Sequence, residues 1–411
     1  MTCPLGTRSL LASSFVLLLF LGSVREAHAQ LPASEARFPA EVDSVEIPFS
    51  IHHGFLVVTV ELDGVRPLEL VVDTGAPVMV LTDTSLAQHL TYQVIAQAQV
   101  DGSGSEAMKT APLVSGLSPR VGGVELSGGL VLLGGGFHHV LMGLDGIIGA
   151  SLFEDAVVRV DPERQQLTLI RPEVFDPSPS RLSIPLVRQP NGHVHTTLKW
   201  ELGGQAFTTE RVLVDTGALQ SLSLYVPEST EIAWPDSMLH DTVIAWGSRG
   251  PVQGDVVRVD TVWLGEHRLP GVVATLRKPE AGDLEEANLG IDVLLLFKSV
   301  FDYGRGRLHL WPIEGMAPPD PWTVGLTVEP PANSQPTAMT IGDVLLGSPA
   351  AEAGLQRGDQ ILEVNGVSMP DLIQGGNARG FLRTEPGAPL RLRVQRGADE
   401  LVTTVRPRRL I

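Results

Sequence analysis

Two short segments of this chain each end an apolar run on a carboxylate that is followed at once by a Thr-Gly turn. Residues 70–76 read Leu-Val-Val-Asp-Thr-Gly-Ala, and residues 212–218 read Val-Leu-Val-Asp-Thr-Gly-Ala. Apolar surroundings make an unpaired charge costly. Two such acids, Asp73 and Asp215, therefore indicate a pair of carboxylates brought face to face. Such a pair shares one proton, and its ionised member can draw a proton from a bound water molecule.

The residues around the two acids repeat in step, which indicates that the chain is built from two related lobes. The glycine of Ile147-Ile148-Gly149 lies 76 residues after Asp73, and the glycine of Asn288-Leu289-Gly290 lies 75 residues after Asp215. Few aromatic residues and many Gly and Pro residues favour short strands joined by tight turns. We therefore expect an all-β protein whose two lobes meet about a pseudo-twofold axis.

The combination of apolar strand, Asp-Thr-Gly-Ala, Gly-rich loop and apolar-apolar-Gly segment resembles the retropepsin-like aspartic proteases. The resemblance covers roughly residues 45–313. It implies a bilobed, pseudo-twofold acid-protease β-barrel fold in which each lobe supplies one aspartate, so that Asp73 and Asp215 form the catalytic dyad. The glycines let the two loops approach without a Cβ clash, and the threonines are expected to hydrogen-bond across the lobe junction. These supporting residues are Thr74, Gly75, Thr216 and Gly217.

Two glycine-containing turns stand where hairpins that cover a substrate are expected. Residues 100–105 follow Asp73, residues 246–250 follow Asp215, and both have the composition of a hairpin tip. We read both as flaps that exclude solvent and bind an extended substrate. Ordinary β-turns are the alternative for both. The flap residues expected to bind substrate are Gly102, Ser103, Gly104, Trp246 and Gly247.

The second copy departs from the first in two places. Asn288 stands where Ile147 stands in the first copy, and a polar side chain there is expected to weaken the packing beneath Asp215. The residues after the two triads also differ, since Pro77 corresponds to Leu219. Neither change touches a carboxylate, so both acids are kept as catalytic candidates.

The composition changes after the second copy. Residues 315–322 form a Pro-rich linker, and residues 347–366 resemble a bacterial-type PDZ domain, a small α+β fold. The resemblance implies a PDZ domain at residues 323–411 that binds a peptide C-terminus as an added strand. A PDZ fold that only packs on the protease is the alternative. The loop expected to hold the peptide carboxylate is Val324, Gly325, Leu326 and Thr327.

The first 29 residues have the pattern of an export signal. Arg8 precedes an apolar run from Leu10 to Leu21, and Ala27-His28-Ala29 is a small-x-small cleavage site. We expect cleavage after Ala29 and a periplasmic or extracellular protein. The run is short for a membrane span, and an uncleaved membrane anchor is the alternative. The single cysteine, Cys3, lies in the signal, so no disulfide is expected.

Charge and histidine spacing exclude other classes of site. The chain carries a net charge of −17, and a nucleic-acid partner needs clustered Lys and Arg instead. The histidines at 52–53, 138–139 and 193–195 lie in no helical His-Glu-x-x-His motif, and paired strand histidines alternate faces. We therefore expect neither a metal nor another cofactor, and read these histidines as ordinary strand or surface residues.

These patterns together predict an exported aspartic-type endopeptidase in which Asp73 and Asp215 activate water. Residues 30–175 would form the first lobe and 176–314 the second, with polypeptides as substrates and a C-terminal peptide as PDZ ligand. One alternative is a non-catalytic peptide-binding scaffold, although the intact acids and glycines argue against it. Another is a two-carboxylate glycosidase, but near-symmetric copies suit equivalent acids better than a distinct acid and base.

Overall fold

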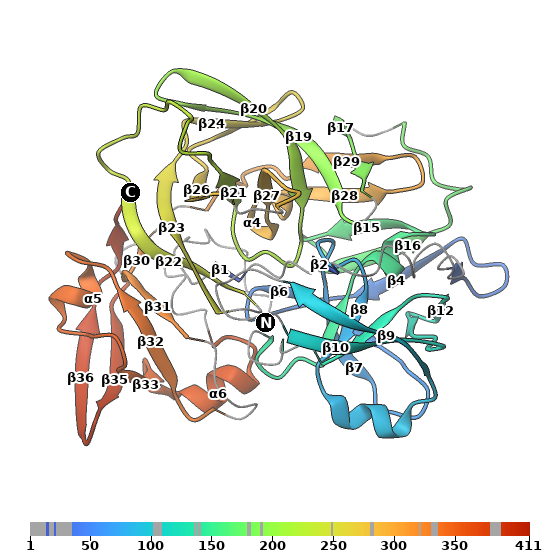
Figure 1. Cartoon of the computed structure of the whole chain (residues 1–411), viewed down its shortest axis with the longest axis horizontal. Coiled ribbons are helices and arrows are strands. Elements are labelled where there is room, and N and C mark those ends of the chain that lie inside the picture. Colours follow the sequence, from blue (N-terminus) through green and yellow to red (C-terminus); the bar gives the residue numbers. More distant parts are fainter. Residues whose placement is uncertain are drawn as a thin grey trace.

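The computed structural model describes residues 35–101, 109–134, 137, 141–178, 182–189, 192–247, 250–279, 283–319, 322–329, 336–378 and 388–411, and the backbone of residues 14–15 and 20–21. Most of these residues lie in β-strands, and the helices are short (Figure 1). The fold class predicted from the sequence, an all-β protein followed by a small domain with helices, is confirmed. Within the described ranges, no helix combines the length and apolar character that crossing a membrane requires.

The main sheet of the N-terminal lobe is built mostly from residues 50–148, whose strands present buried Val, Leu and Ile side chains. A smaller sheet pairs β11 (Arg120–Val121), β12 (Val124–Ser127) and β3 (Glu35–Arg37), and the short helices η1 (Thr84–His89) and α3 (Ala150–Phe153) complete the lobe. The order in the main sheet is β2 (Phe20–Leu21), β9 (Gln93–Asp101), β10 (Lys109–Ser115), β13 (Val131–Leu133), β8 (Met79–Leu81), β14 (Gly146–Ile148), β7 (Leu68–Val72), β6 (Phe55–Val60) and β5 (Ser50–His52).

The main sheet of the C-terminal lobe repeats this arrangement, with helix α4 (Ile291–Leu294) in the place of α3. In both lobes an Asp-bearing strand lies between a hairpin partner and a short parallel strand. The order is β1 (Ser14–Phe15), β22 (Leu239–Gly247), β23 (Gly250–Arg258), β26 (Val273–Arg277), β21 (Leu222–Tyr225), β27 (Ala287–Leu289), β20 (Gln205–Val214), β19 (Val194–Leu202), β24 (Thr261–Leu264) and β25 (His267–Pro270), with β18 (Val187–Arg188) beside β19.

A six-stranded sheet joins the two lobes. Val158 of the first lobe pairs with Phe301 of the second, so the ladder runs without a break across the lobe boundary. One hydrophobic cluster likewise extends through both lobes, and in it the rings of Phe153 and Phe301 meet edge to face with centroids 5.4 Å apart. The strand order is β17 (Leu182–Pro185), β29 (Arg307–Pro312), β28 (Phe297–Asp302), β15 (Val157–Asp161), β16 (Gln166–Ile170) and β4 (Ser44–Pro48).

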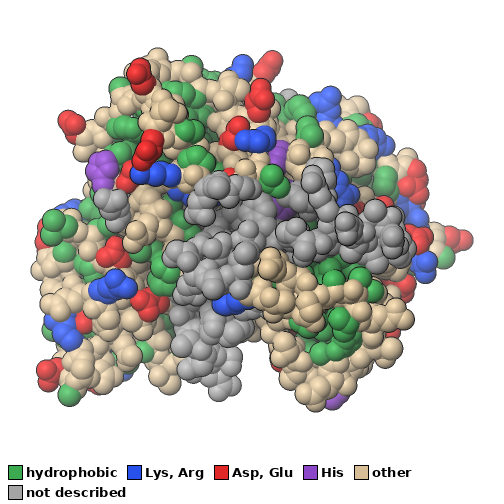
Figure 2. Space-filling view, viewed as in Figure 1, with side chains coloured by type: hydrophobic (Ala, Val, Ile, Leu, Met, Phe, Trp, Pro, Cys, Tyr) green, Lys and Arg blue, Asp and Glu red, His purple; other side chains and the backbone are tan. Residues whose placement is uncertain are grey.

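The C-terminal domain has its own hydrophobic core around antiparallel strands and two short helices. Ser348 caps the helix that Pro349 opens, because its hydroxyl accepts from the N–H of Ala351 at 3.2 Å. Figure 2 shows acidic and basic side chains interspersed over its visible face. Its elements are β30 (Trp322–Thr323), β31 (Leu326–Val328), β32 (Met339–Val344), α5 (Pro349–Glu352), β33 (Gln360–Val364), β34 (Val367–Ser368), α6 (Met369–Gln374), β35 (Leu390–Arg396), β36 (Asp399–Val405) and β37 (Arg408–Arg409).

Both lobes contact the C-terminal domain. The N–H of His53, in the β5–β6 turn, donates to the carbonyl of Gly376 at 2.6 Å. Met142 of the first lobe packs into the core of the C-terminal domain, whereas Ile411 packs into a hydrophobic cluster of the second lobe. In Figure 1 the domain lies beside β22, the strand that carries the second predicted flap. The C-terminal domain is therefore positioned against the part of the second lobe expected to cover a substrate.

Candidate active site

Asp73 and Asp215 lie at the ends of equivalent strands and are both fully buried. Apolar residues of β7 and β20 carry each acid inward, and the parallel neighbour of each strand fixes the backbone beyond it. The N–H of Asp73 donates to the carbonyl of Ile148 at 2.9 Å, and the N–H of Asp215 donates to that of Leu289 at 3.0 Å. The two aspartates therefore occupy matching positions in the two lobes.

The glycines after the aspartates allow the two loops to touch. A Cβ added to Gly75 would lie 2.7 Å from Cγ of Asp215, and one added to Gly217 would lie 2.3 Å from Cγ of Asp73. Any side chain at either position would therefore displace the opposite carboxyl group. Each glycine N–H also donates at 2.8 Å to Oδ1 of the aspartate in its own loop. Both predicted glycines thus lie directly against the dyad.

The two threonines bond reciprocally across the lobe junction. The N–H of Thr74 donates to Oγ1 of Thr216 and the N–H of Thr216 donates to Oγ1 of Thr74, both at 3.0 Å. Each hydroxyl in turn donates to a carbonyl of the other lobe, Thr74 to Val214 at 2.5 Å and Thr216 to Val72 at 2.7 Å. Four buried hydrogen bonds hold the carboxyl groups in a fixed mutual orientation.

Burial and proximity make the two carboxyl groups titrate as a pair. Burial raises the pKa of Asp73 well above its ordinary value, and the neighbouring Asp215 raises it further. Burial also raises the pKa of Asp215, but hydrogen bonds from Asn288 and from the Asp73 carboxyl group oppose that rise. Two buried carboxyl groups that influence each other in this way cannot both ionise at low cost, so they share one proton.

From the sequence we expected Asn288 only to weaken the packing beneath Asp215. The structure gives it a different role. Its side chain is fully buried, and Nδ2 donates to Oδ2 of Asp215 at 2.7 Å. The polar residue that replaces Ile147 is thus a direct partner of one catalytic candidate. Spacing from Gly290 identified the position, but the bond itself depends on the parallel pairing of β27 with β20.

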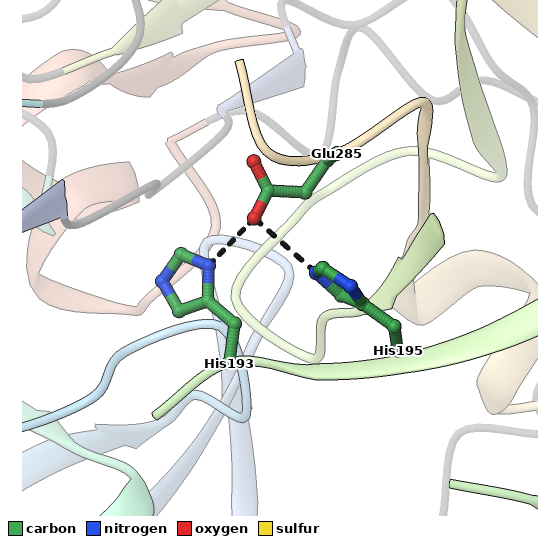
Figure 3. Close-up of side chains that lie close together, drawn as sticks. All are labelled: His193, His195 and Glu285. Atoms are coloured by element: carbon green, nitrogen blue, oxygen red, sulfur yellow. Dashed lines mark hydrogen bonds and ion pairs between the residues drawn. The ribbon is translucent and has the colours of Figure 1, made fainter. Parts of the chain in front are cut away.

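A second correction concerns the histidines at 193 and 195. Because they are two residues apart, both can face one side, and both are buried and point toward Glu285 (Figure 3). Nδ1 of His193 lies 2.8 Å and Nε2 of His195 lies 3.3 Å from Oε1 of Glu285. Burial disfavours the charge on Glu285, but the hydrogen bonds from the histidines prevail and hold its pKa at about 2. Sequence reasoning missed this cluster because Glu285 lies 92 residues from His193.

Among the described residues, these three side chains form a group that could bind a metal ion, because their potential ligand atoms all lie within 4.8 Å of one another. In this structure the contacts of 2.8 and 3.3 Å are direct hydrogen bonds between Glu285 and the histidines. The described arrangement is a buried hydrogen-bonded triad.

Comparison with known proteins identifies two parts of the chain. Residues 58–151 match a family model described as aspartyl protease, and residues 340–396 match one described as PDZ domain. The chain contains an aspartyl protease domain and a PDZ domain. This confirms the resemblance on which the sequence prediction depends. No curated protein matches the chain. Among solved structures, the crystal structure of Basic 7S globulin from soybean aligns at 11% identity and a TM-score of 0.39, over 68% of this chain and 98% of that one.

The second predicted flap of the protease domain is a hairpin. Strands β22 and β23 pair up to Gly247 and Gly250 at the tip. The ring of Trp246 lies against the PDZ domain, since a Cβ added to Gly342 would be 3.1 Å from its Cζ2. The first predicted flap is built on β9 and β10, which pair as far as Val100 and Lys109. Its predicted substrate-binding residues, Gly102, Ser103 and Gly104, lie outside the described residues.

The predicted carboxylate-binding loop of the PDZ domain forms a tight, buried turn. Val324, Leu326 and Thr327 are buried, and Gly325 adopts a φ of +75°. The N–H of Gly325 donates to Oγ1 of Thr323 at 3.0 Å, and Ser348 covers the opposite side. A peptide carboxylate at this loop would therefore have to share or replace the bond that the Gly325 N–H donates to Thr323.

Proposed function

We propose that this protein is an exported aspartic-type endopeptidase with Asp73 and Asp215 as its catalytic dyad. One observation carries the proposal: each buried carboxyl group lies against the glycine of the opposite loop, and the reciprocal threonine bonds fix the two loops together. The ionised member takes a proton from a water molecule while the oxygen of that water attacks the peptide carbonyl carbon. The protonated member donates to the carbonyl oxygen, and the dyad then protonates the leaving amine. Each lobe therefore supplies one of the two essential carboxyl groups.

The edges of the flap strands support an extended peptide as substrate. Leu21 of β2 pairs with Val100 of β9, and Phe15 of β1 pairs with Trp246 of β22. Both flap hairpins therefore present backbone groups that an extended chain can use, as the N-terminal residues do here. Main-chain pairing of this kind suits a peptide substrate and offers little to a sugar.

The carboxyl contact also argues against a glycosidase. Glycosidases place their two carboxyl groups about 5–9.5 Å apart, so that a sugar carbon or a water fits between them. Asp73 and Asp215 instead each lie against the glycine of the opposite loop, where a Cβ would be 2.3 and 2.7 Å from their respective Cγ atoms. The pair is arranged to share a proton and hold one water molecule.

The position of the PDZ domain supports a role in gating the cleft or recruiting substrate. Its strand β32 contacts the second flap through Gly342 and Trp246, and its helix α6 ends beside the β5–β6 turn. A peptide C-terminus bound by this domain would lie next to an element that covers the cleft. Export, with cleavage after Ala29, is part of the proposal and has its support in the N-terminal sequence pattern.

A digest of a peptide library with the purified protein lacking residues 1–29 tests the proposal. Mass spectrometry over acid to neutral pH should detect internal peptide-bond cleavage that both Asp73→Asn and Asp215→Asn abolish. The matched control is Asp236→Asn, because that acid is exposed. Unchanged cleavage in both dyad variants would reject the catalytic assignment. Peptide binding without turnover at every pH would replace the enzyme by a binding scaffold.

A further inference from the structure

The registers of the two sheets show which residues correspond in the two lobes. Val71 of β7 pairs with Ile147 on one side and with Val57 on the other. Leu213, the equivalent residue of β20, pairs with Asn288 and with His195. Asn288 therefore occupies the position of Ile147, and His195 occupies that of Val57. Counting two residues further back along the sequence sets His193 against Phe55.

The four positions beneath the two aspartates are of opposite polarity in the two lobes. Counting back three residues from Ile147 and from Asn288 adds Leu144 and Glu285 as a matched pair. All eight side chains are buried. The first-lobe residues are apolar: Phe55, Val57, Leu144 and Ile147. The second-lobe residues, which we call the polar floor, are His193, His195, Glu285 and Asn288.

The polar floor contacts Asp215 directly. Asn288 donates directly to Oδ2 of Asp215 at 2.7 Å, and His193 favours the ionised form of this aspartate electrostatically. Glu285 in turn holds both histidines (Figure 3). On the side of Asp73 the corresponding side chains offer neither a donor nor a charge. Burial keeps the nearby phenol of Tyr303 neutral, because it raises the pKa of Tyr303 far above its ordinary value.

We propose that the polar floor fixes different roles for the two aspartates, with Asp215 as the ionised base and Asp73 as the proton-carrying acid. The assignment rests on the proposed function and names which member of the dyad performs each step. Asn288 is the positioning residue that acts through Asp215. His193 supports the same preference electrostatically, and Glu285 holds His193 in place.

Counting donors explains the direction of this preference. Oδ1 of Asp215 accepts from Gly217 at 2.8 Å and Oδ2 accepts from Asn288, so a carboxylate is satisfied there. A proton on Oδ2 of Asp215 would face the donating amide. Among the described residues, no donor reaches the buried Oδ2 of Asp73. A charge on Asp73 would thus leave a buried acceptor unsatisfied, whereas a proton there provides a donor for Asp215.

With these roles every proton and bond in the reaction is accounted for. Asp215 takes a proton from water while the water oxygen bonds to the carbonyl carbon and Asp73 gives its proton to the carbonyl oxygen. The resulting gem-diol then returns a hydroxyl proton to Asp73 as the carbonyl re-forms. Asp215 delivers its proton to the nitrogen as the C–N bond breaks, which restores the starting state.

Replacing each aspartate by asparagine tests the asymmetry without requiring any proteolysis. Asparagine resembles a protonated carboxyl group, so Asp73→Asn should melt at or above the temperature of the parent at neutral pH. Asp215→Asn places a second amide next to the amide of Asn288 and removes the carboxylate that accepts its hydrogen bond. This variant should lower Tm by about 3 °C or more. In the Asn288→Leu background the difference in Tm between Asp73→Asn and Asp215→Asn should shrink by at least half. Equal melting of the two single variants, or the reverse order, would overturn the assignment.

A measurement on the unaltered protein covers the case in which a variant fails to fold. Carbon-13 NMR of aspartate-labelled protein, at a pH between the two titrations of the dyad, should show one protonated carboxyl group. Its resonance should be the one lost in Asp73→Asn or, if that variant does not fold, the one unaffected by Asn288→Leu. A protonated Asp215 would overturn the assignment.

Kinetics separates this inference from the proposed function. If the protein is an endopeptidase, Asn288→Leu should raise the lower apparent pKa of its kcat/KM profile by about one unit, because the base loses a donor. An unchanged profile would contradict the role of Asn288. If no peptide is cleaved but melting and NMR still distinguish the aspartates, the endopeptidase proposal fails while the proton assignment stands.

Discussion

Thr74 and Thr216 each donate a backbone N–H to the hydroxyl of the other across the boundary between the lobes, both at 3.0 Å. Each hydroxyl is at once an acceptor for one lobe and a donor to a carbonyl of the other. The two Asp-Thr-Gly loops are therefore one hydrogen-bonded unit, and a change in either threonine should affect both aspartates.

Thr74→Val should destabilise the protein, because it preserves shape but removes the acceptor of the buried Thr216 N–H. We expect a loss of roughly 1–3 kcal/mol in the free energy of unfolding, the cost of an unsatisfied buried donor. Denaturant titration measures it. Thr74→Ser keeps the hydroxyl and serves as the control. Equal stability of the valine variant and the parent would show that the reciprocal bonds contribute nothing.

Gly217→Ala should abolish activity, because the added Cβ would lie 2.3 Å from Cγ of Asp73. Moving a catalytic group by about 1 Å can cost roughly 100-fold in rate, so kcat/KM should fall by at least that factor. Gly304→Ala is the control, since the closest atom to its added Cβ is 3.8 Å away. Similar kinetics for the two variants would be incompatible with the observed contact.

Glu285 should make stability depend on acid pH. Its pKa of about 2 lies below the ordinary value of 4.5, so its contribution is present above about pH 4.5 and is lost as pH falls toward 2. The shift corresponds to a contribution on the order of 3 kcal/mol. Thermal melting from pH 2 to 7 should show a flatter slope for Glu285→Gln than for the parent. The exposed Glu314→Gln is the control, and its slope should match that of the parent.

Gly342→Val should affect substrate binding from within the PDZ domain. A Cβ there would lie 3.1 Å from the Trp246 ring, so a larger side chain should push the second flap away. We expect KM to rise several-fold with a smaller change in kcat, together with altered tryptophan fluorescence. Val367→Ala, an exposed change in the same domain, should leave both unchanged. Normal KM and fluorescence in Gly342→Val would mean that the flap does not depend on this contact.

The sequence was sufficient for the parts of the site that lie close to the repeated motif. An apolar strand that ends in Asp-Thr-Gly predicts a buried acid, and two copies predict the partners that the structure brings together at Asp73 and Asp215. The hairpin at Trp246 follows from turn composition in the same way. These features depend on short stretches of chain, so the residue types of each stretch are enough to predict them.

The polar floor was not predicted, because its bonds depend on strand register. His193 and Glu285 are 92 residues apart and meet only through the pairing of β19, β20 and β27. One signal was present: counting back from Gly149 and Gly290 sets Leu144 against Glu285. An apolar residue matched with a buried acid in a repeat would have indicated a specific partner. Contact between Trp246 and Gly342 had no comparable signal.

The difference between Ile147 and Asn288 has a consequence for how a pair of aspartates at a lobe boundary can evolve. A homodimer has identical halves, so before substrate arrives its symmetry forbids any preference for a proton on one acid. Joining both halves in one polypeptide lifts that restriction, because each copy can then mutate separately. By our proposal, the amide of Asn288 beside Asp215 is enough to place the shared proton on the other aspartate before any substrate binds.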